Sequence, residues 1–589
     1  MIRHLALCRS LRVRPWLFVV AIHVLVGYNA VVHPPYINYD ASGHLSNLEQ
    51  YSRLRFPTPL ESDEFFSPPL PYIGPALVKH FGLVTTTGMW KLAQAQNVLL
   101  SLLLCWQLLR LCRAVRPNDP TFSSWALAFL AMMPVYYKSF AFIRGEPWIA
   151  ALGVVAAFET LRLASEGASS VLTGTLRLGV LCGLLILSRQ WAFFVVAALV
   201  GFLLVSQIRN AGVFRSVRIC AATLAIAAVV GGWFYLRLST EHGSLTAFNR
   251  ERAGRFALSN QPKSFYLGLG LPEVFTHPFR RSFVNQLLPT FFSEFWGDWE
   301  EYFLVYGKDL RGGRYYSAIS LQPEFSQQPR PQWLETNLPA MNRYVGTGQL
   351  LAVFPSLFML GGVIWGLFAF ARWLRRSSGD SKAEPGASQA LSTLIVLVSF
   401  AGYFVFLVLY PSPFNGNTIK ATYMLQTYPF LAFLAALWAV RLAERWPTVM
   451  RWAQVALLLV GFHNLGLCFT RFHGPSDPGP ARLLAPAHAH LDQSWPLGRD
   501  TEVGGDRDAD RPTRVGTTTS HTRVQPVRSS PCARVAGFAL SSQPTTAATH
   551  GCCDGPGQDA SQVAALRRLQ HDARASKQGT PPRLGPRTK

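Results

Sequence analysis

The stretch ALSTLIVLVSFAGYFVFLVLY, residues 390–410, carries no charged side chain over a length that can cross a lipid bilayer. About ten more apolar blocks are similar in length to a membrane-spanning helix, which takes about 20 residues. The short alternating segments of a transmembrane β-barrel do not occur. The sequence therefore predicts an all-α polytopic membrane protein with about 11 transmembrane helices. The predicted spans lie near residues 15–32, 91–111, 121–137, 148–164, 172–188, 190–207, 217–237, 349–371, 390–410, 422–440 and 449–469.

Composition and charge agree with a membrane protein. Charged residues make up 15% of the chain, against roughly 25% in a soluble domain. The formal net charge of +23 would suit nucleic acid, but Lys and Arg are spread over many short loops, so nucleic acid is excluded as a partner. With the predicted spans, the arginine clusters fall on one side, which the positive-inside rule makes cytoplasmic. The clusters lie at residues 3–14, 110–116, 209–218, 372–376 and 441–451.

The same topology divides the chain into four parts. Residues 1–237 form an N-terminal transmembrane module with short outer loops, residues 238–348 one large extracytoplasmic loop, and residues 349–470 the last spans. Residues 475–589 are rich in Pro, Gly, Ser, Thr and Arg, lack periodic apolar positions, and are predicted to be disordered. The N-terminus is expected in the cytoplasm, in a bacterial inner membrane or the endoplasmic reticulum.

The first outer loop, near residues 33–90, holds the most informative polar residues. Asp40 follows the first span and suits the N-cap of a juxtamembrane helix that runs to about Arg53. His44 lies four residues later and shares a helix face with Asp40. Glu64 then leads into a Pro-Pro turn. An acid at a helix start needs no function beyond capping, so both interpretations of Asp40 stay open on the residues alone.

Four short motifs carry a resemblance. Together they resemble the GT-C glycosyltransferases, in the branch of protein O-mannosyltransferases and bacterial aminoarabinose transferases. The similarity extends over residues 15–470. The motifs are Tyr39-Asp40-Ala41-Ser42-Gly43-His44, Glu64-Phe65-Phe66-Ser67-Pro68-Pro69-Leu70-Pro71-Tyr72, Ser293-Glu294-Phe295-Trp296-Gly297-Asp298-Trp299 and Asn417-Thr418-Ile419-Lys420-Ala421-Thr422-Tyr423.

Two positions depart from this family's pattern. Many members carry two adjacent acids in the first loop, whereas here Ala41 follows Asp40. Thr422 stands before Tyr423 where arginine is common.

The resemblance implies transfer of a sugar, with inversion, from a polyprenyl-phosphate or dolichyl-phosphate donor to an acceptor glycan, lipid or protein on the extracytoplasmic face. Asp40 is then the general base, with a pKa raised by partial burial. Glu146 is the second catalytic carboxylate, orienting the acceptor or the base. Glu146 also opens a predicted span, so a carboxylate favoured by the helix dipole is the alternative. The lipid-linked sugar is the donor substrate, and no cofactor is required.

Fixed positive charge is needed to stabilise a departing phosphate. Arg189 lies between two apolar blocks with almost no loop, and an ionisable residue near membrane depth is a functional candidate. Its alternative role is snorkelling to the interface. Lys420 and Tyr423 match the family pattern by position. Lys138 and Arg144 are expected to be ordinary interfacial anchors.

The remaining candidates are expected to contact the substrate. His44 and Glu64 are predicted to line the site, with solvent exposure of Glu64 as the alternative. His44 suits a partner of Asp40 better than a metal ligand, so a divalent metal is possible but not expected. Trp296 and Trp299 suit stacking on a sugar, with Asp298 accepting a hydroxyl hydrogen bond, although tryptophan is also a common interface anchor.

Two other function classes stay open. A transporter or flippase for lipid-linked sugars usually places charge near the bilayer midplane and shows repeated halves, whereas here the acids lie in loops. A noncatalytic protein that binds lipid-linked glycans is the third hypothesis, and the single acid at residue 40 keeps it open.

Overall fold

The computed structural model describes residues 14–165, 171–248, 252–280, 282–304, 306–308, 315–317, 332–375, 385–412 and 416–470. These residues belong to one compact unit, Met1–Ser494. The predicted disordered tail, residues 475–589, lies outside the described residues.

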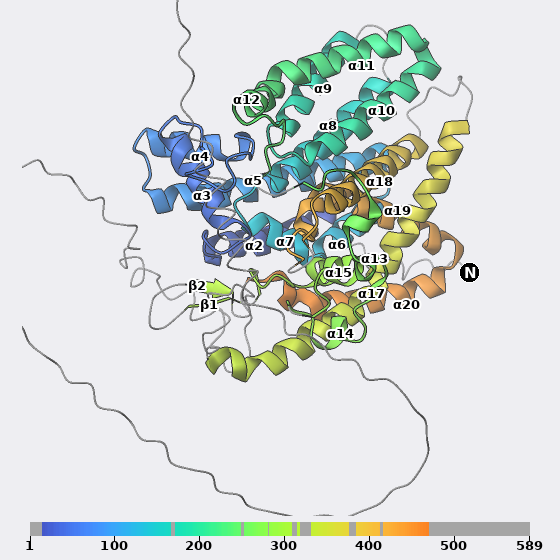
Figure 1. The fold of residues 1–589 in the computed structure, drawn as a ribbon. Helices are drawn as coiled ribbons and strands as arrows, with labels where there is room; N and C mark the ends of the chain where they lie inside the picture. Colours follow the sequence, from blue (N-terminus) through green and yellow to red (C-terminus); the bar gives the residue numbers. More distant parts are fainter. Residues whose placement is uncertain are drawn as a thin grey trace, which may run out of the picture. The chain divides into compact units, whose positions relative to one another are not determined.

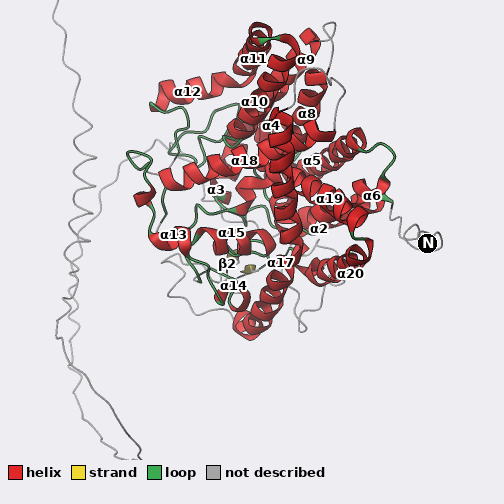
Figure 2. Ribbon diagram, turned by 90° about the vertical axis from the view of Figure 1, so that its right-hand side faces the viewer, coloured by secondary structure: helices red, strands yellow, loops and turns green. Residues whose placement is uncertain are grey.

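The predicted all-α membrane fold is confirmed. Within the described ranges the chain is helical (Figure 2) apart from connections and two short paired strands, β1 (Tyr306–Lys308) and β2 (Tyr315–Ser317), both labelled in Figure 1. Eight described helical runs are long and apolar enough to cross a membrane, so the chain is an integral multi-pass membrane protein. These runs are Pro15–Val32, Thr86–Val115, Glu146–Ser165, Ala192–Ala211, Val213–His242, Leu338–Arg375, Gly386–Leu409 and Ala421–Arg445.

The other three predicted spans are also helical but shorter or broken. The block at 121–137 forms two helices, α6 (Pro120–Ala131) and α7 (Pro134–Ala141), because Pro134 cannot donate a backbone hydrogen bond to continue α6. The block at 172–188 forms α9 (Val171–Ile186), which has 16 residues. The last block forms α20 (Pro447–Asn464) and a 3₁₀ turn, η5 (Leu465–Cys468). The count of about 11 spans therefore stays a prediction.

The long helices pack around α19 (Tyr428–Arg445), which follows the 3₁₀ segment η4 (Ala421–Thr427). In the run Ala421–Arg445, 94% of the most apolar window is buried, as expected for a helix that is apolar on every side. α19 contacts α6, α17 (Gln332–Arg375) and α18 (Pro385–Leu409). On the other side, α8 (Glu146–Ser165), α9, α10 (Ala192–Ala211) and α11 (Val213–Ala227) lie side by side (Figure 1).

The π-helical turn η2 (Ala228–Gly232) joins α11 to α12 (Trp233–His242). Several connections between the long helices hold short helices. α3 (Ala41–Ser52) and α4 (Leu70–His80) follow α2 (Pro15–Val32), and α5 (Thr86–Val115) comes next. The segment 238–348 contains η3 (Leu258–Asn260), α13 (Lys263–Leu267), α14 (Glu273–Thr276) and α15 (Leu287–Trp296).

Polar contacts fix the end of α2, and thereby the start of the first loop. Lys91 Nζ donates to the carbonyl oxygens of Ala30, Val31 and His33 at 3.0, 3.0 and 2.9 Å, which caps the helix at its negative end. Asn29 Nδ2 donates to the Cys468 carbonyl at 2.8 Å, joining α2 to η5. The end of α2, which leads into Tyr39 and Asp40, is therefore held both by α5 and by η5 near the end of the described chain.

Candidate functional site

A small cavity lies where several connections between the helices meet. Four of the residues predicted from sequence line this cavity: Asp40, Glu64, Arg189 and Tyr423. The other lining residues are Phe66, Trp191, Phe248 and Phe406. The fold thus brings together side chains from the start of α3, the loop before α4, the α9–α10 connection, the stretch after α12, α18 and η4.

Asp40 forms an ion pair rather than a helix cap. It occupies the N-cap position of α3 with a φ of +56°, and its side chain makes no capping hydrogen bond. Lys420 Nζ donates to Asp40 Oδ2 at 3.1 Å; the Asp40 side chain is 32% exposed and that of Lys420 only 4%.

The sequence-based expectation that burial raises the pKa of Asp40 is not met. Burial by itself raises this pKa, but the positive charges of Lys420 and Arg144 outweigh it and hold the pKa of Asp40 below its usual range. Asp40 is therefore an ionised carboxylate at neutral pH.

Arg189 joins two carboxylates at the short connection between α9 and α10. Its Nη1 lies 2.8 Å from Glu64 Oε2, and its Nε lies 3.4 Å from Glu146 Oε1. It also donates to the Ser67 hydroxyl, which in turn donates to Glu64 at 2.5 Å. The Arg189 side chain is 4% exposed, so it does not snorkel to an interface.

A close backbone approach makes this bridge possible. A Cβ added to Gly145 would meet the Ser188 carbonyl oxygen at 2.1 Å. Only glycine lets the two connections touch at this point, and they carry Glu146 and Arg189 on either side of the contact.

Two tyrosines and two cations surround Asp40, and we call Tyr39, Tyr423, Arg144 and Lys420 the tyrosine–cation cluster. The Lys420 ammonium lies 4.6 Å from the centre of the Tyr39 ring and 5.5 Å from that of Tyr423. The Arg144 guanidinium lies 5.3 Å and 5.2 Å from the same two centres. Arg144 also pairs with Glu146 at 3.2 Å. Two cations, each paired with a carboxylate, thus lie beside the cavity in a largely buried setting, where electrostatic interactions are strong.

The prediction that Lys138 and Arg144 are interfacial anchors is wrong. Both side chains are buried in the protein, at 0% and 2% exposure, and both are ion-paired. Lys138 pairs with Glu294, far along the chain, and this carboxylate also accepts a hydrogen bond from the Tyr39 hydroxyl. Burial raises the pKa of Glu294 to about 7, despite the lowering effect of the Lys138 charge.

His44 does not pair with the Asp40 carboxylate. Its Nδ1 lies 2.7 Å from the Tyr72 hydroxyl, in a fully buried position. Burial, reinforced by the charges of Arg144 and Arg189, holds the pKa of His44 well below its usual value, so the ring is neutral. Within the described ranges, no group of three or more His, Cys, Asp or Glu side chains is placed to hold a metal ion.

Trp296, Asp298 and Trp299 do not line the cavity. Trp296 Nε1 donates to Ser356 Oγ at 2.8 Å, and Trp299 Nε1 donates to the Ser282 carbonyl at 3.2 Å. Asp298 Oδ2 accepts the backbone N–H groups of residues 303 and 304 at 2.7 and 2.6 Å. All three side chains are buried and hydrogen-bonded within the protein, so they stabilise the fold and do not contact the cavity.

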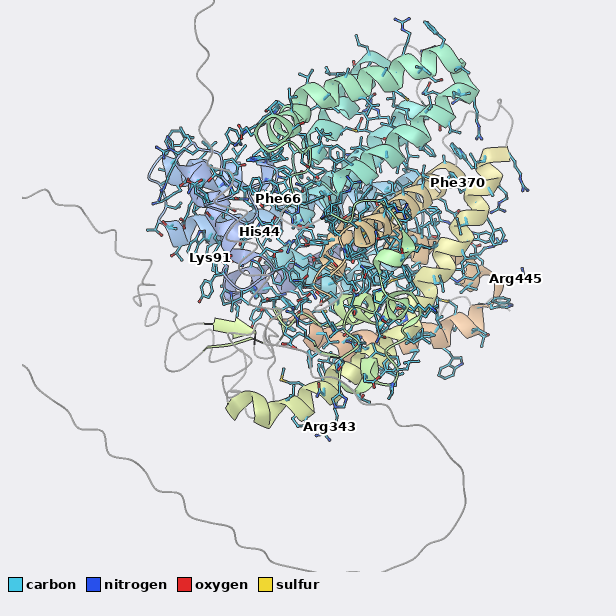
Figure 3. The ribbon with its side chains drawn as sticks, in the orientation of Figure 1. His44, Phe66, Lys91, Arg343, Phe370 and Arg445 are labelled. Carbon is cyan, nitrogen blue, oxygen red and sulfur yellow. The ribbon has the colours of Figure 1, made fainter. Side chains whose placement is uncertain are left out.

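The aromatic wall of the cavity was not predicted. Trp191 lies 4.9 Å from the Tyr423 ring centre and 4.7 Å from that of Phe406, and it stacks at 6.2 Å on Phe248. The one signal in the sequence was the position of Trp191 two residues after Arg189. Phe66 lies in the motif that begins at Glu64, whereas Phe248 and Phe406 have no such signal, because they come from distant segments. Figure 3 labels Phe66 and His44 in this part of the molecule.

Comparison with known proteins finds similar solved structures but no similar sequence. No protein-family model matches the sequence, and no curated protein matches it. Two crystal structures are similar to this chain, both of ArnT from Cupriavidus metallidurans, one bound to undecaprenyl phosphate and one in the apo state. Each match has 15% identity and covers 73% of this chain and 79% of ArnT, with TM-scores of 0.31 and 0.32. At these values the likeness assigns no activity, so function is argued below from the chain's own residues.

Proposed function

We propose that the chain is a membrane glycosyltransferase of the GT-C type. It transfers a sugar from a polyprenyl-phosphate or dolichyl-phosphate donor to a hydroxyl or amine of an acceptor, with inversion, on the extracytoplasmic face. The acceptor class is a glycan, a lipid or a protein.

The observation that carries this proposal is the ion pair between Asp40 and Lys420 at the cavity. The two residues are 380 positions apart and lie 3.1 Å from each other. A transfer from a lipid phosphate needs a base for the acceptor and a cation for the leaving phosphate, close together but on different groups. This pair supplies both, and its carboxylate is partly exposed.

The proposed chemical step uses these two groups in turn. The acceptor oxygen or nitrogen attacks the anomeric carbon, and its bond to that carbon forms as the bond from the carbon to the phosphate oxygen breaks. The phosphate leaves with the electron pair, and the proton of the acceptor goes to Asp40. Lys420 and Arg144 offset the negative charge that develops on the leaving oxygen.

Donor binding also makes Asp40 a better base. In the structure, Lys420 holds the pKa of Asp40 low, and a carboxylate with a low pKa accepts a proton weakly. A donor phosphate that pairs with Lys420 in place of Asp40 removes this effect, so the pKa of Asp40 rises when the donor is bound. The base is then activated only in the loaded enzyme.

Glu64 and Glu146 act on the cations rather than on the acceptor. Each is buried against Arg189, and Glu146 also pairs with Arg144. We propose that the two carboxylates fix the guanidinium groups at the cavity edge. This differs from the role of Glu146 implied by the resemblance, in which it orients the acceptor or the base.

The test is mass spectrometry of lipid-linked sugars and surface glycans in a strain that lacks the gene. We expect a glycan to lose a sugar and the matching lipid-linked donor to accumulate. The wild-type gene should restore the profile, and the Asp40→Asn variant should not. An unchanged profile contradicts the transferase, whereas full restoration by Asp40→Asn at normal expression fits a flippase or a noncatalytic binder.

A further inference from the structure

We propose that residues 256–271 lie in the surface of the lipid bilayer, with three leucines inserted among the acyl chains. These residues belong to the segment 238–348, which the sequence predicts to be one large extracytoplasmic loop. The partner is membrane lipid, and the inference does not depend on the proposed function. We call the three side chains the leucine strip: Leu267, Leu269 and Leu271.

The leucine strip points away from the protein, whereas the glycines between its members face inward. Residues 267–271 read Leu-Gly-Leu-Gly-Leu, and the three leucines are 76%, 57% and 57% exposed. A Cβ added to Gly268 would meet the Gln286 side chain at 2.4 Å, and one added to Gly270 would meet Pro289 Cβ at 2.6 Å. A contiguous apolar patch of this kind is unusual on a surface that faces water and indicates an interaction.

The residues before the strip run alongside α18, which contains one of the membrane-spanning runs. Three contacts, taken in chain order, meet α18 progressively farther from its end: Ala253 N–H to the Leu409 carbonyl at 2.9 Å, Gln261 Nε2 to the Leu407 carbonyl at 2.8 Å, and the Tyr266 ring to the Phe404 ring at 6.2 Å. The step from residue 409 to residue 404 is about 7.5 Å along an α-helix, at about 1.5 Å per residue. The leucine strip begins at the next residue, and so it begins at the level of an apolar span.

The charges near the strip also suit a lipid surface. Residues 252–271 carry Arg252, Arg255 and Lys263 and no acidic residue, and the three basic side chains are exposed. Basic side chains beside apolar ones are typical of segments that lie in the membrane interface, where the charge meets lipid phosphate and the apolar groups enter the acyl region. Because the strip also lies beside a spanning helix, we assign lipid rather than a soluble protein as its partner.

The experiment measures how deep the strip lies in a bilayer. A fluorescent amino acid replaces Leu269 in the full-length protein, which is held as one copy per lipid nanodisc so that a second copy cannot cover the strip. The quenchers are iodide, which stays in water, and phospholipids brominated either near the headgroup or deep in the acyl chain. Thermal unfolding of each labelled protein shows whether it is folded.

Two matched controls carry the same probe at other exposed positions. Val229 is 80% exposed and lies near the middle of the spanning run Val213–His242, so it reports the acyl region. Asn118 is exposed in the short turn between α5 and α6, so it reports water.

We expect bromine near the headgroup to quench the Leu269 probe at least about 3-fold more than the Asn118 probe, because an interfacial segment lies roughly 5–10 Å deep. Iodide should quench the Leu269 probe at least about 3-fold less than the Asn118 probe. Deep bromine should be the stronger lipid quencher at Val229 and the weaker one at Leu269.

Two results overturn the inference. If iodide quenches the Leu269 probe as strongly as the Asn118 probe and the brominated lipids do not quench it, the strip faces water. If no quencher reaches the Leu269 probe, protein covers the strip and lipid is not its partner. Either result leaves the proposed function intact, because the measurement involves neither donor nor acceptor.

Discussion

Replacing Arg189 by methionine should destabilise the protein by about 3–5 kcal/mol, because it leaves buried carboxylates without their shared cation. The side chains of Glu64 and Glu146 are 4% and 1% exposed and lie 2.8 and 3.4 Å from the guanidinium. Glu146 keeps Arg144 as a partner, whereas the Ser67 hydroxyl is the only side-chain partner that the described residues leave to the Glu64 carboxylate. Most of the cost should therefore come from Glu64.

The assay is equilibrium unfolding in mixed micelles, followed by the loss of helical signal. Arg189→Lys should cost about 1–3 kcal/mol, because lysine keeps the charge but lacks the fork that reaches both carboxylates. The double variant Arg189→Met/Glu64→Gln should recover at least half of the loss, since it removes the stranded charge. Arg177→Met, at an exposed arginine of the preceding helix α9, is the matched control.

Two outcomes would refute this reasoning. If Arg189→Met costs no more than Arg177→Met, the bridge does not stabilise the fold. If the double variant is as unstable as the single one, the loss comes from packing around Arg189 and not from an unpaired Glu64.

Three further predictions concern other parts of the site. Lys420→Met should raise the pKa of Asp40, because burial then acts without the opposing charge, so the acidic limb of the residual pH–rate profile should move to higher pH; an unmoved limb contradicts the pairing. Burial raises the pKa of Glu294 from 4.5 to about 7, so its contribution to stability is complete below pH 4.5 and is lost as the pH rises through about 7. Glu294→Gln should flatten the unfolding free energy over this window, and an unchanged slope between pH 4.5 and 7 contradicts it. Gly145→Ala adds a Cβ only 2.1 Å from a carbonyl oxygen, so it should lower both stability and transfer activity, whereas Gly201→Ala, with no atom within 4 Å, should be neutral; equal behaviour of the two contradicts the close approach.

The helices could be predicted from sequence because each is encoded locally. A charge-free block such as residues 390–410 has few folded states available in lipid, and α18 forms there. The break of the block 121–137 at Pro134 was also encoded locally and could have been predicted, since proline ends a helix.

The cavity could be predicted only in part. Asp40, Glu64 and Arg189 stood out as ionisable residues in the connections between apolar blocks, and Tyr423 through its motif, and the fold brings them together. The ion pair between Asp40 and Lys420 could not be predicted, because the two residues are 380 positions apart. The effect of Lys420 on the pKa of Asp40 depends on that contact.

Residues with distant partners were misjudged for the same reason. Lys138 looked like an interfacial anchor because its partner Glu294 is 156 residues away. Trp296 and Trp299 stood out as a motif, but their indoles are used within the protein. Trp191 was missed because an aromatic residue at the start of an apolar block is ordinary in a membrane protein.

Sugar release from a lipid-phosphate donor is the most direct test of the proposed function. The purified protein is reconstituted in liposomes with polyprenyl-phosphate sugars and an extract of the native membrane as the source of acceptor, and free polyprenyl phosphate is measured over time. The proposed function predicts acceptor-dependent release that Asp40→Asn slows by about 10²- to 10⁴-fold, with donor binding retained. Asp63→Asn, at an exposed acid of the same loop, should keep the wild-type rate. Release by Asp40→Asn at the wild-type rate, or no release by the wild type from any donor, would contradict the proposal.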